Sequence, residues 1–514
     1  MTTVNPGYPG LYPPPPAVPP VQGPLLPRYG EPGWSVWPRR VWPLDPMASA
    51  PRRVVVLALV AGFFGTSVWR IGTLSVGYLL VGVLVFGVVY GTAHRRPRRD
   101  EWLGIAATLA LLAVPGVLAA TWLGVLCVAA AWLVGWCALV GGRTWTAVFG
   151  GPLIPWLAPA RVAGWTQRGL PASGVGVSRD RALRASVVLA VTILLALVFG
   201  GLFASADPAF ARVLSLLTPE WSVGELIARA VVFGVVVAFV LIGAYLVGSA
   251  PSLDAAAPAP MRPVPRWEWT VPLAVLDALF LGFVAVQATV LFGGREHVLG
   301  TDGLTYAEYA RQGFWQLLWV AALTLLVLAA VVRVAARVGP RDRLLLRVLV
   351  GTLCATSVVV VVSAVYRMWV YQQAYGFSVQ RLVVITIELW LGAVFLMIAF
   401  AGIRMAGRWL PRAVLFAGVV ALLGMAAVNP ERFIAEYNID RYERTGQLDT
   451  EYLLRLSSDA EPALRRLPEA MRVCALHRDD ERDPWYLFNA SRARANDGGT
   501  PAGDACAEYR ETPR

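Results

Sequence analysis

Long apolar runs recur along most of this chain and constrain its fold more than any other feature. A helix of about 20 apolar residues crosses a hydrocarbon core of about 30 Å. Backbone groups in lipid must be satisfied within the segment itself, so these runs are expected to be helices. Eleven runs occur, at approximately 54–69, 72–92, 102–120, 122–141, 185–205, 226–248, 269–292, 314–336, 346–369, 380–403 and 411–428. The sequence therefore predicts an all-α, polytopic transmembrane helical bundle of about eleven spans, with the lipid bilayer as its surroundings.

The composition supports a membrane protein rather than a soluble one. Hydrophobic residues make up 57% of the chain and charged residues only 15%, whereas a soluble chain carries roughly 25% charged residues. The formal net charge is +12, and strongly basic chains can bind nucleic acid. Here the arginines lie beside the apolar runs, where they face lipid headgroups and the cytoplasm. We therefore expect no nucleic-acid partner.

The chain contains 45 arginines and no lysine, so its basic charge comes from arginine. When the N-terminus is placed inside, no outer segment carries more arginines than either inner neighbour. The loop with Arg262 and Arg266 is the weakest point, since it only equals the outer segments beside it. The pattern follows the positive-inside rule of multi-pass proteins in the cell (plasma) membrane. An odd number of spans then predicts a cytoplasmic N-terminus and an extracytoplasmic C-terminal segment.

The regions flanking the transmembrane domain, 51–428, differ from it in composition. Residues 1–50 contain 14 prolines, which predicts a disordered or polyproline II tail. The chain after Val428 holds 17 of the 33 acidic residues, with sparse apolar residues at helical spacing. We expect a small helical extramembrane segment over 429–496 and a flexible end over 497–514.

Two cysteines lie in this C-terminal part of the chain, Cys474 and Cys506. Outside the cytoplasm, oxidising conditions would let them form a disulfide, and two free thiols are the alternative. His477 stands at a zinc-like spacing from Cys474, but a structural zinc site needs four ligands. We therefore expect no metal at this position.

Several enzyme classes do not fit the sequence. Without lysine there is no Walker A loop and no Schiff base, and the three scattered histidines form no H-E-x-x-H site. A membrane-embedded glycosyl or lipid transferase is a further alternative. Polyprenyl-phosphate-sugar glycosyltransferases typically place acidic residues in the first outer loop, but here that loop offers Arg70, Ile71 and Gly72. We therefore expect a non-enzymatic protein without a cofactor.

Polar residues at membrane depth are costly and therefore mark candidate sites. Asp277 lies about a third of the way into the run 269–292, Glu388 lies near the middle of 380–403, and Gln287 adds a further polar group. These residues can form a proton or ion relay, or they can join helices by bonding to an arginine or tyrosine. We favour the second interpretation, because the broken helices and internal repeats typical of transporters are not evident.

Five short stretches resemble an uncharacterised bacterial membrane family. They lie at 205–210, 309–314, 367–376, 429–440 and 456–460. The family is domain-of-unknown-function family 4173, which is related to family 4153, and the resemblance covers roughly residues 54–495. The resemblance implies a polytopic membrane protein and carries no known activity.

Most of these stretches lie at or beside span ends that the arginine pattern places outside. We expect an outer-face polar layer that docks the C-terminal segment and binds a ligand or protein partner. Its candidate residues are Asp207, Tyr309, Arg311, Arg367, Tyr371, Tyr375 and Arg381. The leading hypothesis is a non-enzymatic envelope sensor, scaffold or assembly partner acting through this face. The alternative is a secondary transporter with Asp277 and Glu388 as coupling carboxylates.

Overall fold

The computed structural model describes most of the predicted membrane domain and much of the C-terminal segment. The described residues are 41–42, 49–93, 95–169, 192, 195, 199, 203, 207, 223–256, 264–292, 314–335, 339–469, 471–472 and 483–496. The chain divides into two units, Met1–Leu44 and Asp45–Arg514, and helices α2 to α23 all belong to the second. Several predicted features lie outside the described residues: almost all of the tail 1–50, the end 497–514, the pair Cys474 and Cys506, and the layer residues Tyr309 and Arg311.

Ten of the eleven predicted spans coincide with described helices. These are α2 (Arg52–Val68), α3 (Gly77–Thr92), α4 (Arg99–Val117), α5 (Thr121–Val140), α11 (Val223–Gly248), α12 (Arg266–Phe292), α15 (Phe314–Val334), α16 (Pro340–Tyr375), α17 (Val379–Arg404) and α18 (Leu410–Val428). Eight of them are long and apolar enough to cross a membrane, and α3 is a shorter apolar helix. The all-α polytopic bundle is therefore confirmed. The run 185–205 falls outside the described residues apart from isolated positions, so the eleventh span stays a prediction.

Local sequence signals explain where several helices begin and end. Helix α16 starts at Pro340, whose fixed φ suits the first helical position, and Asp342 accepts a hydrogen bond from the Gly339 N–H at 3.2 Å. It ends before Gly376, which has a φ of 79°, a conformation that glycine adopts without steric cost. Asn429, with a φ of 52°, ends α18 and caps the next helix with its side chain.

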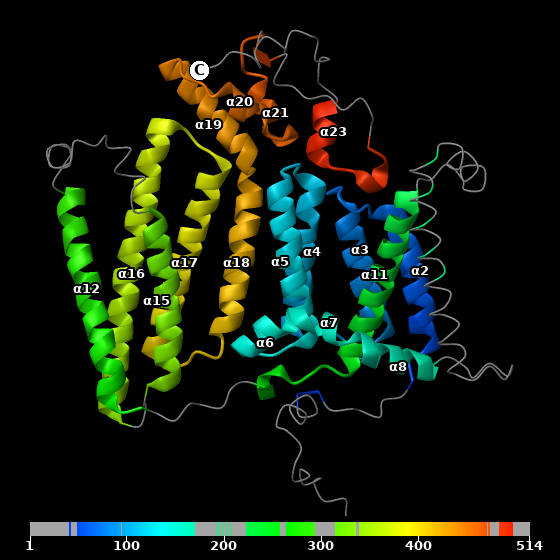
Figure 1. Cartoon of the computed structure of the whole chain (residues 1–514), viewed down its shortest axis with the longest axis horizontal. Helices are drawn as coiled ribbons and strands as arrows, with labels where there is room; N and C mark the ends of the chain where they lie inside the picture. The colour runs from blue at the N-terminus through cyan, green and yellow to red at the C-terminus, as the bar shows by residue number, and fades with distance from the viewer. Residues whose placement is uncertain are drawn as a thin grey trace, which may run out of the picture. The chain divides into compact units, whose positions relative to one another are not determined.

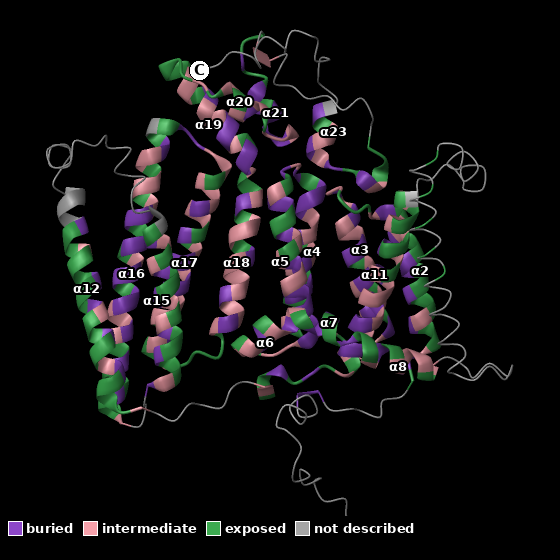
Figure 2. Ribbon diagram, in the orientation of Figure 1, coloured by how far each residue is buried: buried purple, intermediate pink, exposed green. Residues whose placement is uncertain are grey.

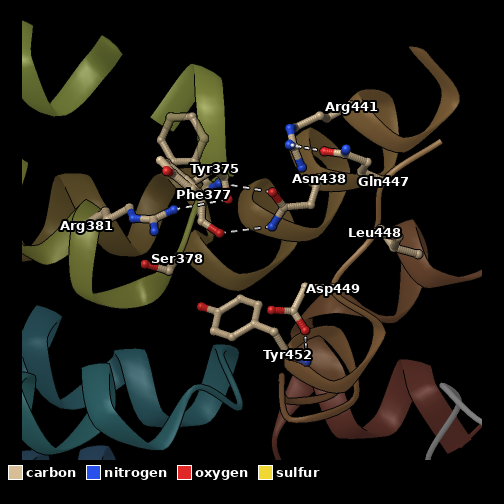
Figure 3. Close-up of a pocket in the computed structure, with 10 residues that line it drawn as sticks. All are labelled: Tyr375, Phe377, Ser378, Arg381, Asn438, Arg441, Gln447, Leu448, Asp449 and Tyr452. Atoms are coloured by element: carbon tan, nitrogen blue, oxygen red, sulfur yellow. Dashed lines mark hydrogen bonds between the residues drawn. The ribbon is translucent and has the colours of Figure 1, made fainter. Parts of the chain in front are cut away.

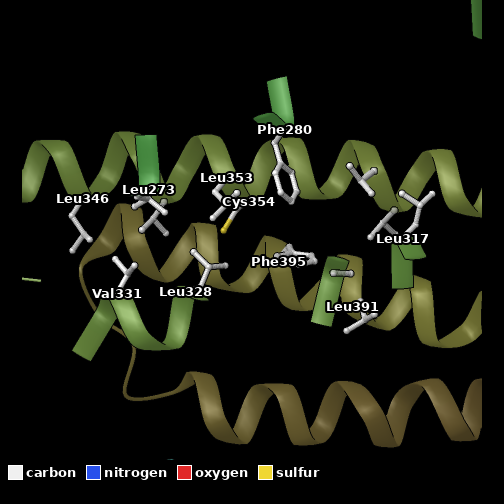
Figure 4. Close-up of a cluster of buried hydrophobic side chains, with 14 of the residues drawn as sticks. Leu273, Phe280, Leu317, Leu328, Val331, Leu346, Leu353, Cys354, Leu391 and Phe395 are labelled. Atoms are coloured by element: carbon white, nitrogen blue, oxygen red, sulfur yellow. The ribbon is translucent and has the colours of Figure 1, made fainter. Parts of the chain in front are cut away.

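The spanning helices pack in two groups with α18 between them (Figure 1). One group contains α2, α3, α4, α5 and α11, and the other contains α12, α15, α16 and α17. Close approach in the first group depends on glycine, since a Cβ on Gly62 would lie 2.6 Å from Val237 of α11. The second group has a core of leucines, valines and Phe395 (Figure 4). Helix α18 packs Val419 and Met425 against α4 and α5.

Many large apolar side chains remain exposed on the long helices. Leu279 of α12 and Trp319 and Leu326 of α15 are examples, and the outward surfaces of these helices are largely exposed (Figure 2). Soluble monomers rarely expose apolar surface of this extent. The exposed surface is instead suited to contact with lipid.

The C-terminal segment lies over one end of the bundle (Figure 1). It contains α19 (Pro430–Thr445), α20 (Thr450–Leu454), η3 (Ser458–Ala460), α21 (Glu461–Leu464), η4 (Trp485–Leu487) and α23 (Ala490–Asn496). Ile439, Leu453 and Leu464 contribute to a small apolar core of its own. The segment is therefore helical and packed.

Short helices lie at the opposite end of the bundle (Figure 1). They are α6 (Trp145–Gly150), η1 (Gly151–Leu153), α7 (Ile154–Leu157), α8 (Pro159–Gly169) and η2 (Leu253–Ala256). Asp254 joins two of them, because its carboxylate accepts hydrogen bonds from the N–H groups of Arg143 and Thr144 at 2.8 and 3.0 Å. These bonds fasten η2 to the start of α6.

Candidate functional site

The turn between α4 and α5 receives a cap from a residue far along the chain. Ala120 is the N-cap residue of α5 and has no side-chain oxygen to bond the first N–H groups of the helix. The Asp459 carboxylate takes this place, accepting hydrogen bonds from Ala119 N–H at 2.9 Å and Ala120 N–H at 2.8 Å. A carboxylate at a helix N-terminus also interacts favourably with the helix dipole. Asp459 is only 1% exposed, so this contact is a buried joint.

The other side of the same turn is bonded by Asn489. Its side-chain nitrogen donates to the carbonyl oxygens of Pro115 and Leu118, at 2.9 and 2.7 Å. Its side-chain oxygen accepts from the N–H groups of Ser491 and Arg492, both at 3.0 Å. One buried amide therefore serves the orphan carbonyls at the end of α4 and the orphan N–H groups at the start of α23.

The C-terminal segment bonds the turn between α2 and α3 through backbone groups. The N–H of Val76 donates to the carbonyl of Phe488 at 3.0 Å. The Ser75 hydroxyl donates to the carbonyl of Tyr486 at 3.4 Å. Arg492 donates to the carbonyl of Leu74 at 3.3 Å.

The turn between α16 and α17 is held by α19 and α20. The Asn438 amide bonds both backbone groups of Phe377, with each N···O distance 3.0 Å. The Tyr452 hydroxyl oxygen accepts from the N–H of Val379 at 2.7 Å, at the start of α17. The Phe377 ring packs edge-on against Tyr437, with ring centres 4.4 Å apart. Burial raises the pKa of Tyr452 and outweighs the opposite effect of the Val379 N–H, so the phenol stays protonated.

Glu431 adds a contact between α19 and the bundle. Its carboxylate accepts from the indole N–H of Trp122 in α5 at 2.9 Å and from the N–H of Ser457 at 2.5 Å. The C-terminal segment is thus bonded to three interhelical turns and to the start of α5. All three turns lie at one end of the bundle, as the alternation of spans requires.

A pocket of about 170 Å³ lies where the α16–α17 turn meets the C-terminal segment (Figure 3). It is lined by Tyr375, Phe377, Ser378, Arg381, Asn438, Arg441, Gln447, Leu448, Asp449 and Tyr452. Two guanidinium groups and one carboxylate give this lining a net positive charge. Arg381 donates to the carbonyl of Tyr375 at 3.3 Å and also to that of Gly376. The pocket is therefore suited to a small anionic group, since arginine presents several donors in a fixed geometry.

Three of the predicted outer-layer residues come together beside this pocket. The rings of Tyr371 and Tyr375 have centres 4.8 Å apart, and the Arg381 guanidinium lies 4.5 Å from the centre of the Tyr371 ring. Arg367 lies two turns before Tyr375 on α16. Asp207 is described only as an isolated residue, whose N–H donates to the carbonyl of Phe203.

The docking roles of the side chains that fasten the segment were not predicted from the sequence. Glu431, Asn438 and Asp459 nevertheless fall within the stretches 429–440 and 456–460, which carry the family resemblance. The resemblance was therefore the one sequence signal from which these side chains could have been found. Asn489, which lies outside those stretches, had no such signal.

The intramembrane candidates are placed differently from one another. Gln287 of α12 accepts a hydrogen bond from the Ser363 hydroxyl of α16 at 3.2 Å, so it joins two helices. Asp277 is 4% exposed and Glu388 is 1% exposed. Both oxygens of Asp277 and the Oε1 atom of Glu388 have no hydrogen-bond partner within the described parts of the chain. The expected bond from Glu388 to an arginine or tyrosine is not among the described contacts, and Arg381 bonds the α16–α17 turn instead.

Comparison with known proteins places the chain in a family. Residues 103–467 match the family model described as Domain of unknown function (DUF4153). The match begins in α4 and ends after α21, so it covers the bundle from α4 onward and the part of the C-terminal segment that contains Asp459. No curated protein and no solved structure matches the chain. The expected relation to family 4153 is confirmed, and membership of family 4173 stays a prediction. Since the match covers well over half of the sequence, this integral membrane protein belongs to the DUF4153 family.

Proposed function

We propose that this protein is a non-enzymatic envelope sensor, scaffold or assembly partner of the plasma membrane. It acts through the face that the C-terminal segment forms, outside the cytoplasm. The observation that carries the proposal is the bonding of this segment to three interhelical turns. A segment fastened in this way presents a fixed surface to a partner. It also transmits any displacement of that surface directly to the spanning helices.

The pocket beside Arg381 supports binding of a protein partner at this face. Its volume of about 170 Å³ is below the roughly 300 Å³ at which small-molecule sites begin. It is large enough for one side chain, and its two arginines favour a carboxylate, which guanidinium groups bind in bidentate fashion. The proposed partner therefore inserts an aspartate or glutamate side chain here.

Photo-crosslinking in intact cells tests this proposal. A photoreactive amino acid would replace Tyr375, which is exposed at the pocket, and Leu326 on the lipid-facing surface would be the control position. We expect a discrete protein adduct from position 375 and none from position 326. The adduct should disappear with Arg441→Glu in the pocket and persist with Arg455→Glu, an exposed arginine of the same segment. An adduct that both variants retain would contradict the pocket as the binding site.

A second candidate function is a proton- or ion-coupled secondary transporter. The specific observation in its favour is the burial of Asp277 and Glu388 without described hydrogen-bond partners. Burying a carboxylate without a partner is costly, and such residues within spans commonly serve transport. Glu388→Gln should then abolish transport and leave the crosslink from position 375 unchanged. A scaffold would tolerate Glu388→Gln and fail when residues 430–496 are removed.

A further inference from the structure

Besides the indole nitrogen of Trp269, four buried polar side chains of α12, α16 and α17 have atoms without described hydrogen-bond partners. They are both oxygens of Asp277, the Ser357 hydroxyl, the side-chain amide of Gln372 and Oε1 of Glu388. Each of the four residues is at least nine-tenths buried. Buried polar groups are ordinarily bonded, and within a membrane domain bulk water cannot relieve the cost. Four such groups in one half of the bundle therefore require a common explanation.

Two interhelical contacts fix the height of these groups along α16. The hydrogen bond between Gln287 and Ser363 sets the register of α12 against α16. Because both helices run in the same direction (Figure 1), Asp277, ten residues before Gln287, lies level with Leu353.

The height of Glu388 follows from the approach of α17 to α16. A Cβ on Gly392 would lie 3.3 Å from Val361, so these two residues are level. Helix α17 runs in the opposite direction to α16, and Glu388 precedes Gly392 by four residues. Glu388 therefore lies level with Val365, about one turn nearer the C-terminal segment.

The groups together extend across the membrane. From the level of Asp277 to Gln372 is about 28 Å at a helical rise of about 1.5 Å per residue, close to the thickness of the hydrocarbon core, about 30 Å. Successive groups are separated by about 6, 12 and 10 Å along the axis, on the same helical rise. Ser357 and Gln372 also share one face of α16, since 15 residues of an α-helix return to within about 60° of the starting direction.

We propose that these side chains form a proton pathway through the α12, α16 and α17 half of the bundle. Asp277 and Glu388 each accept a proton from one neighbour and release it to the next. Ser357 and Gln372 donate hydrogen bonds to, and accept them from, the water molecules that link the four side chains. This inference rests on the transporter candidate and names its coupling ion.

Flux measurements on the full chain in liposomes test the pathway. A potassium gradient with valinomycin would drive protons, and an enclosed pH-sensitive dye would report them. We expect a flux that falls by about a hundredfold, or to the rate of empty liposomes, in Glu388→Gln and in Asp277→Asn, because each removes a proton carrier. Thr324→Val is the matched control, since Thr324 is buried in α15 and its hydroxyl already bonds the carbonyl of Val320.

The outcomes separate this inference from the function on which it rests. Trypsin protection of the C-terminal segment would first confirm that each variant is folded. Parent flux equal to that of empty liposomes, or equal flux in Glu388→Gln and the parent, would overturn the pathway. A parallel assay with a sodium gradient and a sodium dye tests whether sodium is the coupling ion instead. Sodium flux without proton flux would refute the proton pathway and leave an ion-coupled transporter standing.

Discussion

Replacing Asp459 by alanine should release the C-terminal segment from the α4–α5 turn. The change removes an anionic acceptor from two N–H groups, and a hydrogen bond to a charged group contributes about 1.5–3 kcal/mol. Ala120 is 1% exposed, so its N–H would remain buried without a partner, whereas Ala119 is half-buried and water can reach it. We therefore expect the substitution to lower the free energy of detaching the segment by about 3 kcal/mol, the lower end of the sum for two such hydrogen bonds. The detached state should then be populated about a hundredfold more than in the parent, at tenfold per 1.4 kcal/mol.

Limited proteolysis of the folded protein measures this population. Trypsin cleavage after Arg465 or Arg466 requires local opening, and its rate follows the open fraction when reclosing is fast. Glu451→Ala is the matched control, because it removes the same charge from the same segment at a side chain that is 72% exposed. An exposed pair of this kind contributes less than about 1 kcal/mol. Equal cleavage rates in the Asp459 and Glu451 variants would refute the capping argument.

Two further predictions concern the joints at opposite ends of the bundle. Gly376→Ala should lower the free energy of unfolding by at least about 2 kcal/mol. The added Cβ strains a backbone with a φ of 79°, and it would lie 2.4 Å from the side-chain oxygen of Asn438. Gly446→Ala, at a φ of 70° with open space around it, is the control for strain alone, and equal losses in denaturant melts would contradict the role of Asn438. At the other end, burial acts to raise the pKa of Asp254, but hydrogen bonds from the N–H groups of Arg143 and Thr144 and from the Thr144 hydroxyl hold it below its usual value. A carboxyl group whose pKa is lowered by folding stabilises the folded state at pH values above its pKa in the unfolded chain. This stabilisation is lost as the pH falls through its pKa in the folded protein. The melting temperature of the parent should therefore exceed that of Asp254→Asn at pH near 6, and the difference should shrink below pH of about 4; a constant difference would count against this assignment.

The spanning helices could be predicted because run length and hydropathy act locally. Helix α18 matches its predicted run 411–428, but α16 extends beyond its predicted run 346–369 to Pro340 and Tyr375, because polar residues continue the helix at both ends. The short helices α6 to α8 could not be predicted, because segments of so few residues have no clear apolar period and become helical through tertiary packing. Their position in an arginine-rich linker gave no indication of helical structure.

The candidate site was only partly predictable for a different reason. The arginine pattern correctly grouped the turns around Ser75, Ala119 and Phe377 at one end of the bundle. It had no means of pairing Asp459 with Ala119, because a cap supplied by a distant residue leaves no periodic signal in either segment. Membrane depth likewise located Asp277 and Glu388, but it could not predict that Arg381 bonds the α16–α17 turn and not Glu388.

The two candidate functions make opposite demands on the same contacts. Alternating access moves one helical group against the other, and the C-terminal segment is bonded to both groups. Detaching the α16–α17 turn breaks the two Asn438 bonds and the Tyr452 bond, at about 1 kcal/mol each. It also separates the Phe377 ring from Phe433 and Tyr437, at about 0.5 kcal/mol or more for each pair. A loss of about 4 kcal/mol leaves a detached population on the order of 0.1%, at the lower limit of the range that functional minor states occupy. The joint at Asp459 and Asn489 is stronger, because it is buried and includes a charged acceptor. If the groups move, the segment therefore stays on the α4–α5 turn and releases the α16–α17 turn, next to the pocket and above the helices that carry Asp277 and Glu388. A partner that fills the pocket would then prevent the release of the α16–α17 turn. A sensor and a transporter are therefore compatible in one chain.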